Sequence, residues 1–230
     1  MFMSRQALRR ARGFTLIELL IALAAMAILA VMSWRGIDGM ARTQAAHRER
    51  SDEVLVLQTA LTQWSTDLDA AADFGTSSAI DWNAGVLRVL RRGVDPTGAP
   101  CAYVVGWAQR NGEQGPSWQR WQSPPLTTRA QWQQAWTMAL SWGQNGSNPG
   151  NGATVSLLPL TTWSVAWYRN GVWAPAGDSS GTQGQSSTQT TTPAMPDGVR
   201  LILTLPPGAG LAGDLTRDWV RPTWGTSKTS

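Results

Sequence analysis

The chain has 230 residues, of which 42% are hydrophobic and 8% are aromatic. This composition is sufficient for one packed domain in addition to any membrane anchor. The single cysteine, Cys101, excludes an intrachain disulfide, so packing must stabilise the folded part. The formal net charge of +4 would by itself indicate an anionic partner.

The excess of positive charge comes from the first thirteen residues. They contain four arginines, Arg5, Arg9, Arg10 and Arg12, and no acidic residue. Without these four, 15 of the 19 basic residues remain, which equals the 15 acidic residues. The remaining chain has no long basic stripe of the kind that follows nucleic-acid phosphates. We therefore expect no nucleic-acid partner.

An apolar run follows this basic segment. It extends from Phe14 to about Met32, with the sequence FTLIELLIALAAMAILAVM, and only Thr15 and Glu18 interrupt it. A helix of about 20 mostly apolar residues can cross a bilayer. The run is longer than the apolar core of an ordinary secretory signal, which has about 7 to 15 residues. Residues 14–34 are therefore predicted to span a membrane once, with residues 1–13 as a leader.

The junction of these segments, Gly13-Phe14-Thr15-Leu16-Ile17-Glu18, resembles the prepilin peptidase site of type IV pilins and type II secretion pseudopilins. The resemblance consists of a basic leader, glycine before phenylalanine, and glutamate at the fifth mature position. In that family the bond between the glycine and the phenylalanine is cut on the cytoplasmic side, and the new terminus is N-methylated. The resemblance implies that a prepilin peptidase and N-methyltransferase removes residues 1–13 and methylates Phe14.

Glu18 is the unusual residue of the apolar run. A carboxylate inside a membrane helix is costly and marks a functional position by default. Cleavage would create a positive amine on Phe14, one helical turn away, with which Glu18 could pair in its own chain or in a neighbour. In the family, pairing between subunits is thought to set the register of assembly. The alternative interpretation is a glutamate at the membrane edge that extends to the lipid headgroups.

The helix is predicted to continue beyond the membrane, to about Ala72. Polar residues increase from Arg42 to Glu53, and apolar residues then recur at spacings of three and four. Residues 35–72 are therefore the expected amphipathic continuation, or spine, of the helix. The apolar stripe comprises Val54, Leu57, Leu61, Trp64 and Leu68.

Residues 73–230 are predicted to be the β-rich part of the same domain, which gives an α+β class with a long helix packed on an antiparallel sheet. Asn170-Gly171 predicts a hairpin, and the spacing of three apolar residues predicts a helix over residues 128–142. Residues 143–152 and 177–192 are rich in small polar residues and are expected to be flexible loops. Strands are predicted at 86–90, 103–107, 163–168, 199–205 and 215–221.

Three stretches resemble the minor pseudopilins of the J class: LQTALTQWSTDLD, WSVAWYRNGVW, and MPDGVRLILTL followed by LTRDWVRP. The resemblance implies a pilin-like subunit of the bacterial inner membrane whose C-terminal domain lies in the periplasm. It also implies a tip complex with the I-class and K-class minor pseudopilins, with the major pseudopilin and the inner-membrane assembly platform as further partners. Such a tip primes pseudopilus assembly and supports export of folded proteins across the outer membrane.

Two alternatives remain. One is a minor pilin of a type IV pilus, with a role in assembly, motility or DNA uptake. The other is a membrane-anchored periplasmic binding module, suggested by the 14 tryptophans of the chain. Aromatic faces can bind a sugar or a protein, although tryptophans are more often buried in a core. The candidate platform is Trp118, Trp121, Trp132 and Trp136.

No enzymatic activity is expected. Residues 177–181, GDSSG, match the G-x-S-x-G pattern of serine hydrolases, but they lie in a predicted loop, and the only histidine, His47, lies on the anchor helix. Asp67, Asp69 and Asp73 lack the glycine and the terminal glutamate of a calcium loop, so a solvated helix end is expected there. One cysteine and one histidine do not form a zinc site. We expect no metal and no cofactor.

Overall fold

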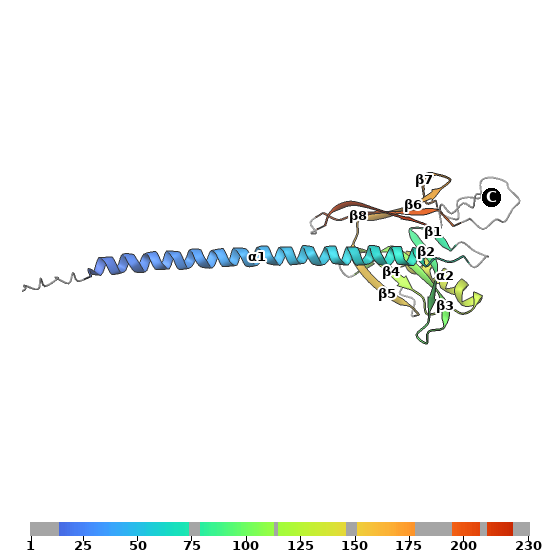
Figure 1. The fold of residues 1–230 in the computed structure, drawn as a ribbon, viewed down its shortest axis with the longest axis horizontal. Coiled ribbons are helices and arrows are strands. Elements are labelled where there is room, and N and C mark those ends of the chain that lie inside the picture. Colours follow the sequence, from blue (N-terminus) through green and yellow to red (C-terminus); the bar gives the residue numbers. More distant parts are fainter. Residues whose placement is uncertain are drawn as a thin grey trace, which may run out of the picture. The chain divides into compact units, whose positions relative to one another are not determined.

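The computed structural model describes residues 14–73, 79–112, 115–145, 151–177, 195–207 and 211–222. The chain divides into two compact units, Met1–Glu49 and Arg50–Ser230. Helix α1 (Leu16–Asp69) contributes to both units (Figure 1). The predicted leader, most of the predicted 177–192 loop and the middle of the 143–152 loop lie outside the described residues.

Helix α1 is three residues shorter at its C-terminal end than the prediction. The reason is that the chain joins a sheet directly after Asp69. Ala71 pairs with Arg91, the Ala72 amide donates to the carbonyl of Leu90 at 3.0 Å, and the Arg92 amide donates to the carbonyl of Ala70 at 2.9 Å. These backbone bonds replace the helical pattern.

Sheet A has five antiparallel strands in the order β1-β2-β3-β4-β5. Helix α2 (Arg129–Asn145) lies between β4 and β5 in the chain. The helix was predicted from the spacing of its apolar residues, and its presence is confirmed. The strands are β1 (Ile80–Asn83), β2 (Val86–Val94), β3 (Pro100–Gly112), β4 (Gly115–Gln122) and β5 (Ala153–Pro159).

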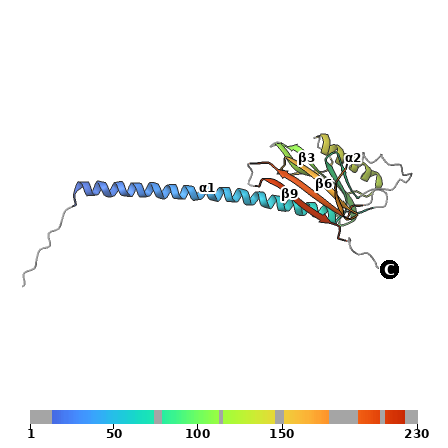
Figure 2. The same ribbon diagram turned by 90° about the horizontal axis from the view of Figure 1, so that it is seen from above.

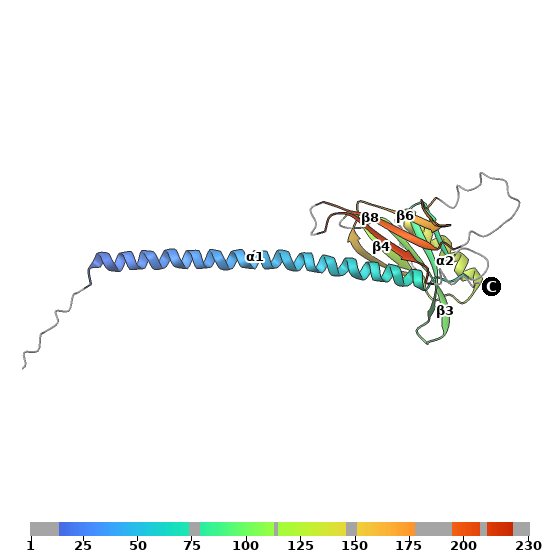
Figure 3. The same ribbon diagram turned by 45° about the horizontal axis from the view of Figure 1, so that its top comes forward.

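Sheet B has four antiparallel strands in the order β7-β6-β8-β9. The predicted hairpin at Asn170-Gly171 is confirmed, because Arg169 pairs with Val172 and both turn residues have positive φ, 52° and 81°. Figure 3 shows β6 and β8 side by side. The strands are β6 (Thr162–Arg169), β7 (Val172–Pro175), β8 (Gly198–Leu205) and β9 (Gly213–Val220).

The last turns of α1 pack together with both sheets. One hydrophobic core contains Trp64 and Leu68 of α1, Val105 and Trp107 of β3, and several residues of β6, β8 and β9, among them Leu201. In Figure 1, β6 and β8 of sheet B lie on one side of this part of α1, and β4 and β5 of sheet A lie on the other. The predicted α+β class, a long N-terminal helix with antiparallel strands, is confirmed, but the strands form two sheets rather than one.

Helix α2 covers the other face of sheet A and encloses a second core. Sheet A is therefore buried on both faces, as β2 shows. Leu87 and Val89 lie in the first core, whereas Val86 and Leu90 lie in the second, as the alternation of side chains along a strand requires. In Figure 2, α2 and β9 accordingly lie on opposite sides of the domain.

The tryptophans mostly build these cores. Five of them are almost completely buried: Trp64, Trp107, Trp118, Trp121 and Trp142. The proposed platform of four exposed tryptophans is wrong, because Trp118 lies in the first core and Trp121 in the second, on opposite faces of sheet A. Trp132 and Trp136 are half-buried and pack against the second core.

The burial of Trp64 in the first core predicts that its removal destabilises the domain. We expect Trp64→Ala to lower the free energy of unfolding of the domain by about 3 to 5 kcal/mol, because it leaves a large cavity between α1 and both sheets. Pulse proteolysis of the full chain in urea would measure this change. Trp34→Ala is the matched control, since Trp34 is 76% exposed on α1. An equal effect of the two variants would contradict the assigned core.

Candidate functional site

The start of α1 holds the first candidate site. Thr15 caps the helix, and its backbone N–H and hydroxyl donate to Oε2 of Glu18 at 3.0 and 2.8 Å. The Glu18 amide donates back to Oγ1 of Thr15 at 3.4 Å. This reciprocal arrangement is a capping box, in which a threonine and the glutamate three residues later satisfy backbone donors of the first helical turn.

The capping box was missed in the sequence analysis, although its signal is present. Threonine followed three residues later by glutamate, at the head of an apolar run, is the capping-box pattern. In the uncut chain Glu18 therefore has a role that requires no partner molecule. Its other oxygen, Oε1, forms no hydrogen bond with any described residue. That oxygen is available to a further donor.

The helix that follows is apolar on all sides. In the unit Met1–Glu49, the large hydrophobic side chains between Phe14 and Met32 are all more than half exposed. A globular surface helix would instead have one apolar face. Among the described residues, α1 is the one helix that is long and apolar enough to cross a membrane.

Other predicted site residues are placed as follows. Phe14 is described and 85% exposed, whereas Gly13, on the other side of the predicted scissile bond, lies outside the described residues. His47 lies on α1 in the unit Met1–Glu49. Of the G-x-S-x-G stretch only Gly177 is described. No group of three or more histidine, cysteine, aspartate or glutamate side chains that could hold a metal ion occurs in the described part of the chain.

The second candidate site is at the C-terminal end of α1, where Asp67 is completely buried. The prediction of a solvated helix end is therefore wrong for this residue. Arg120 donates from Nε to Oδ2 at 2.8 Å and from Nη2 to Oδ1 at 2.9 Å, and Trp107 Nε1 donates to Oδ2 at 3.0 Å. Arg91 and Gln63 also donate to Oδ1. A buried carboxylate is tolerated when donors of this kind surround it.

These contacts join α1 to three strands of sheet A. Arg91 belongs to β2, Trp107 to β3 and Arg120 to β4. Two further carboxylates of α1 contact the other side of the domain. Asp69 accepts a hydrogen bond from Trp219 Nε1 of β9 at 2.8 Å, and Glu53 accepts one from the amide of Leu211 at 3.2 Å. The acidic residues thus fix the helix in the domain.

The exposed face of the same helix segment is nearly free of charge. Leu55 and three threonines lie on it at spacings of four, three and four residues. Each threonine hydroxyl donates to the carbonyl four residues earlier at 2.8 Å, so its methyl group is the part that remains for contact. We call this surface the threonine face; it comprises Leu55, Thr59, Thr62 and Thr66.

Loss of the Asp67 carboxylate would leave Arg91 and Arg120 half-buried without their counter-ion. We therefore expect Asp67→Ala to lower the free energy of unfolding by about 3 to 5 kcal/mol. Pulse proteolysis of the full chain would show this, with Asp52→Ala as the control because Asp52 is an exposed aspartate on the same helix. A loss below about 1 kcal/mol, which is typical of a surface ion pair, would show that the cluster is dispensable.

Residues 8–34 match the family model described as the prokaryotic N-terminal methylation motif. A comparison with curated proteins finds no match. Among solved structures, the chain is similar to a chain in the crystal structure of the GspK-GspI-GspJ complex from the type 2 secretion system of enterotoxigenic Escherichia coli. The identity is 17% and the TM-score 0.45, over 73% of this chain and 96% of that chain.

The N-terminus thus carries a type IV prepilin-like methylation motif. The matched residues include Gly13, Phe14, Thr15 and Glu18 and the whole apolar run. The motif and the apolar helix together fit a prepilin-like membrane anchor.

Proposed function

We propose that this protein is a minor pseudopilin of the J class in a type II secretion system. Its role is structural rather than catalytic: it is a subunit of the pseudopilus tip, which primes assembly and supports export of folded proteins. The observation that carries the proposal is the methylation motif over residues 8–34, which leads into an apolar helix long enough to span a membrane.

The domain supports this proposal through its architecture. A pilin-like subunit needs a helix that serves first as an anchor and then as the spine of a folded part. In the unit Arg50–Ser230 the last turns of α1 have that second role, since Trp64 and Leu68 lie in the core and Asp67 binds arginines of sheet A. The J class itself rests on the three sequence stretches that resemble it.

The proposal assigns each segment a place. Residues 1–13 are removed at the bond between Gly13 and Phe14, and Phe14 is methylated. Residues 14–34 cross the bacterial inner membrane, residues 35–72 form the spine, and residues 73–230 lie in the periplasm. The partners are the I-class and K-class minor pseudopilins, the major pseudopilin and the inner-membrane assembly platform. The threonine face is the proposed contact for a partner helix, because it has few polar groups to desolvate.

The first test is the intact mass and the N-terminal sequence of the membrane-extracted protein, expressed with and without a prepilin peptidase. We expect a methylated Phe14 start with the peptidase and a Met1 start without it. An uncut chain in both cases, or a cut after the apolar run, would refute the prepilin assignment.

A minor pilin of a type IV pilus is the second candidate, because the same N-terminal motif supports it. Partner capture separates the two. Co-purification of the cross-linked, processed protein with I-class and K-class pseudopilins supports the J class, and co-purification with type IV pilins supports the alternative. Loss of protein export when the protein is deleted, rather than loss of motility or DNA uptake, would also support the J class.

Substitutions of Glu18 can distinguish its role in capping the helix from its proposed role in pairing with a charged amine. Glutamine also forms a capping box, but it carries no charge. We expect Glu18→Gln and Glu18→Ala to be inserted and cleaved normally, and both to be incorporated poorly into the pseudopilus, because neither can pair with a neighbour's amine. Quantification of pseudopilus-associated protein measures this. Normal incorporation of Glu18→Gln together with a defect of Glu18→Ala would show that capping alone is needed.

A further inference from the structure

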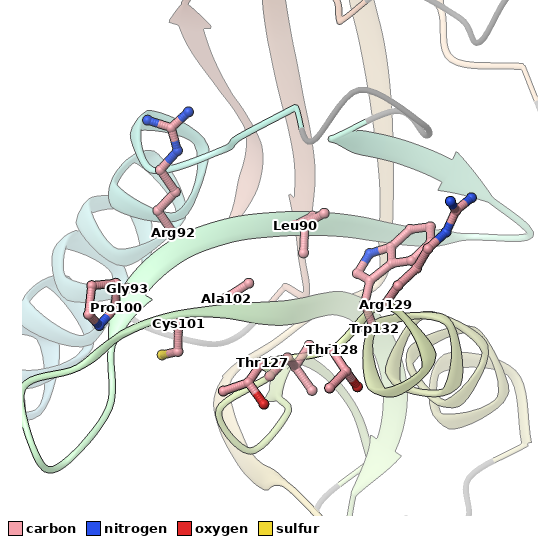
Figure 4. A pocket seen from close by; sticks show the side chains of 11 residues that line it. Leu90, Arg92, Gly93, Pro100, Cys101, Ala102, Thr127, Thr128, Arg129 and Trp132 are labelled. Carbon is pink, nitrogen blue, oxygen red and sulfur yellow. The ribbon is translucent and has the colours of Figure 1, made fainter.

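An apolar pocket of about 560 Å³ lies on sheet A, at the start of α2. The end of β2 supplies Leu90, Arg92 and Gly93, and the start of β3 supplies Pro100, Cys101 and Ala102. Residues 126–129 and Trp132 complete its lining. Figure 4 shows these side chains around the space between the strands and α2. We call this the Cys101 pocket.

The shape of the pocket is fixed by its neighbours. Ala102 pairs with Leu126 through two backbone hydrogen bonds of 3.0 and 2.8 Å, and the chain then turns into α2. The amides of Thr127 and Thr128 donate to Oε1 of Gln131 at 2.9 and 3.1 Å. This capping contact holds the turn. It satisfies two amides that precede Arg129, the first residue of α2.

The chemistry of the lining is apolar with a positive rim. Leu90 and Leu126 are only 3% and 7% exposed, so they form a floor on which further apolar groups can be buried. Arg92 and Arg129 are both exposed, and neither forms an ion pair with another described residue. The lining contains no acidic side chain.

The two arginines are separated. In Figure 4 the guanidinium groups of Arg92 and Arg129 lie at opposite ends of the lining residues. A single phosphate or headgroup would therefore meet one of them. Two carboxylates on either side of an apolar group would meet both, which is the chemistry of a short acidic and apolar peptide segment.

We propose that the Cys101 pocket binds a segment of another protein in which apolar side chains are flanked by carboxylates. The apolar side chains lie over Leu90 and Leu126, and the carboxylates contact Arg92 and Arg129. This site is distinct from the threonine face and from the anchor. It does not depend on the class of pilin-like subunit to which the chain belongs.

Alkylation of Cys101 can report whether the pocket is occupied, because Cys101 is the single cysteine of the chain and lines the pocket. The test uses the full chain in phosphatidylcholine nanodiscs and measures the rate of Cys101 alkylation by N-ethylmaleimide. The probe is the peptide Ac-Asp-Leu-Leu-Asp-amide. At ten times its dissociation constant we expect alkylation to slow about tenfold.

Two control peptides test the two parts of the recognition. Ac-Lys-Leu-Leu-Lys-amide reverses the charges, and Ac-Asp-Ser-Ser-Asp-amide removes the apolar side chains. Neither is expected to protect Cys101. Equal protection by either control, or no protection by the first peptide, would overturn the proposal. Protection by phosphatidylglycerol nanodiscs or by inorganic phosphate, without an effect of the peptide, would assign the pocket to those anions instead.

Variants of the chain complete the test. Arg92→Gln and Arg129→Gln should each raise the peptide concentration required for half protection by roughly fivefold, as loss of about 1 kcal/mol from an exposed pair implies. Arg217→Gln, an exposed arginine on β9, should leave it unchanged. Cys101→Ser should bind the peptide with the same affinity in calorimetry. Identical protection in Arg92→Gln, Arg129→Gln and Arg217→Gln would refute the role of the rim.

Discussion

The domain depends on one buried carboxylate. Asp67 is completely buried, and the donors around it come from three strands and from α1 itself. Desolvation of a carboxylate costs several kcal/mol unless such donors replace water. The arrangement is therefore stable only when the helix and the strands are all in place. This requirement selects one register of α1 against sheet A. Apolar packing by Trp64 and Leu68 alone would specify that register less strictly.

The two ends of α1 use the same chemical group in different ways. At the start, the Glu18 carboxylate is exposed and, among the residues that the structure describes, is bonded only to Thr15, so one of its oxygens is available to a further donor. At the other end, both oxygens of Asp67 are saturated by the chain's own side chains. The Glu18 carboxylate can still accept a hydrogen bond, which suits its proposed pairing with another subunit. The Asp67 carboxylate has no acceptor capacity left, which suits its role in stabilising the domain.

Much of this fold is predictable from local patterns. The helical stripe of Val54 to Leu68, the Asn170-Gly171 turn and the α2 segment each have a short-range signal that the structure confirms. Strand β4 was missed because its two tryptophans, Trp118 and Trp121, are three residues apart and so lack the period of two that predicts a strand. The polar residue Arg120 between them is bonded to Asp67, which lies far away in the chain. The burial of Asp67 and the division into two sheets depend on contacts between residues far apart in the chain, which spacing does not encode. The capping box was local and could have been found.

The hydroxyl groups of the threonine face are already bonded to their own helix. A neighbouring helix that docks on this face does not have to break these hydrogen bonds, because both partners of each bond belong to α1. In the proposed pseudopilus, a contact through this face can therefore form and separate without the loss of a hydrogen bond within α1.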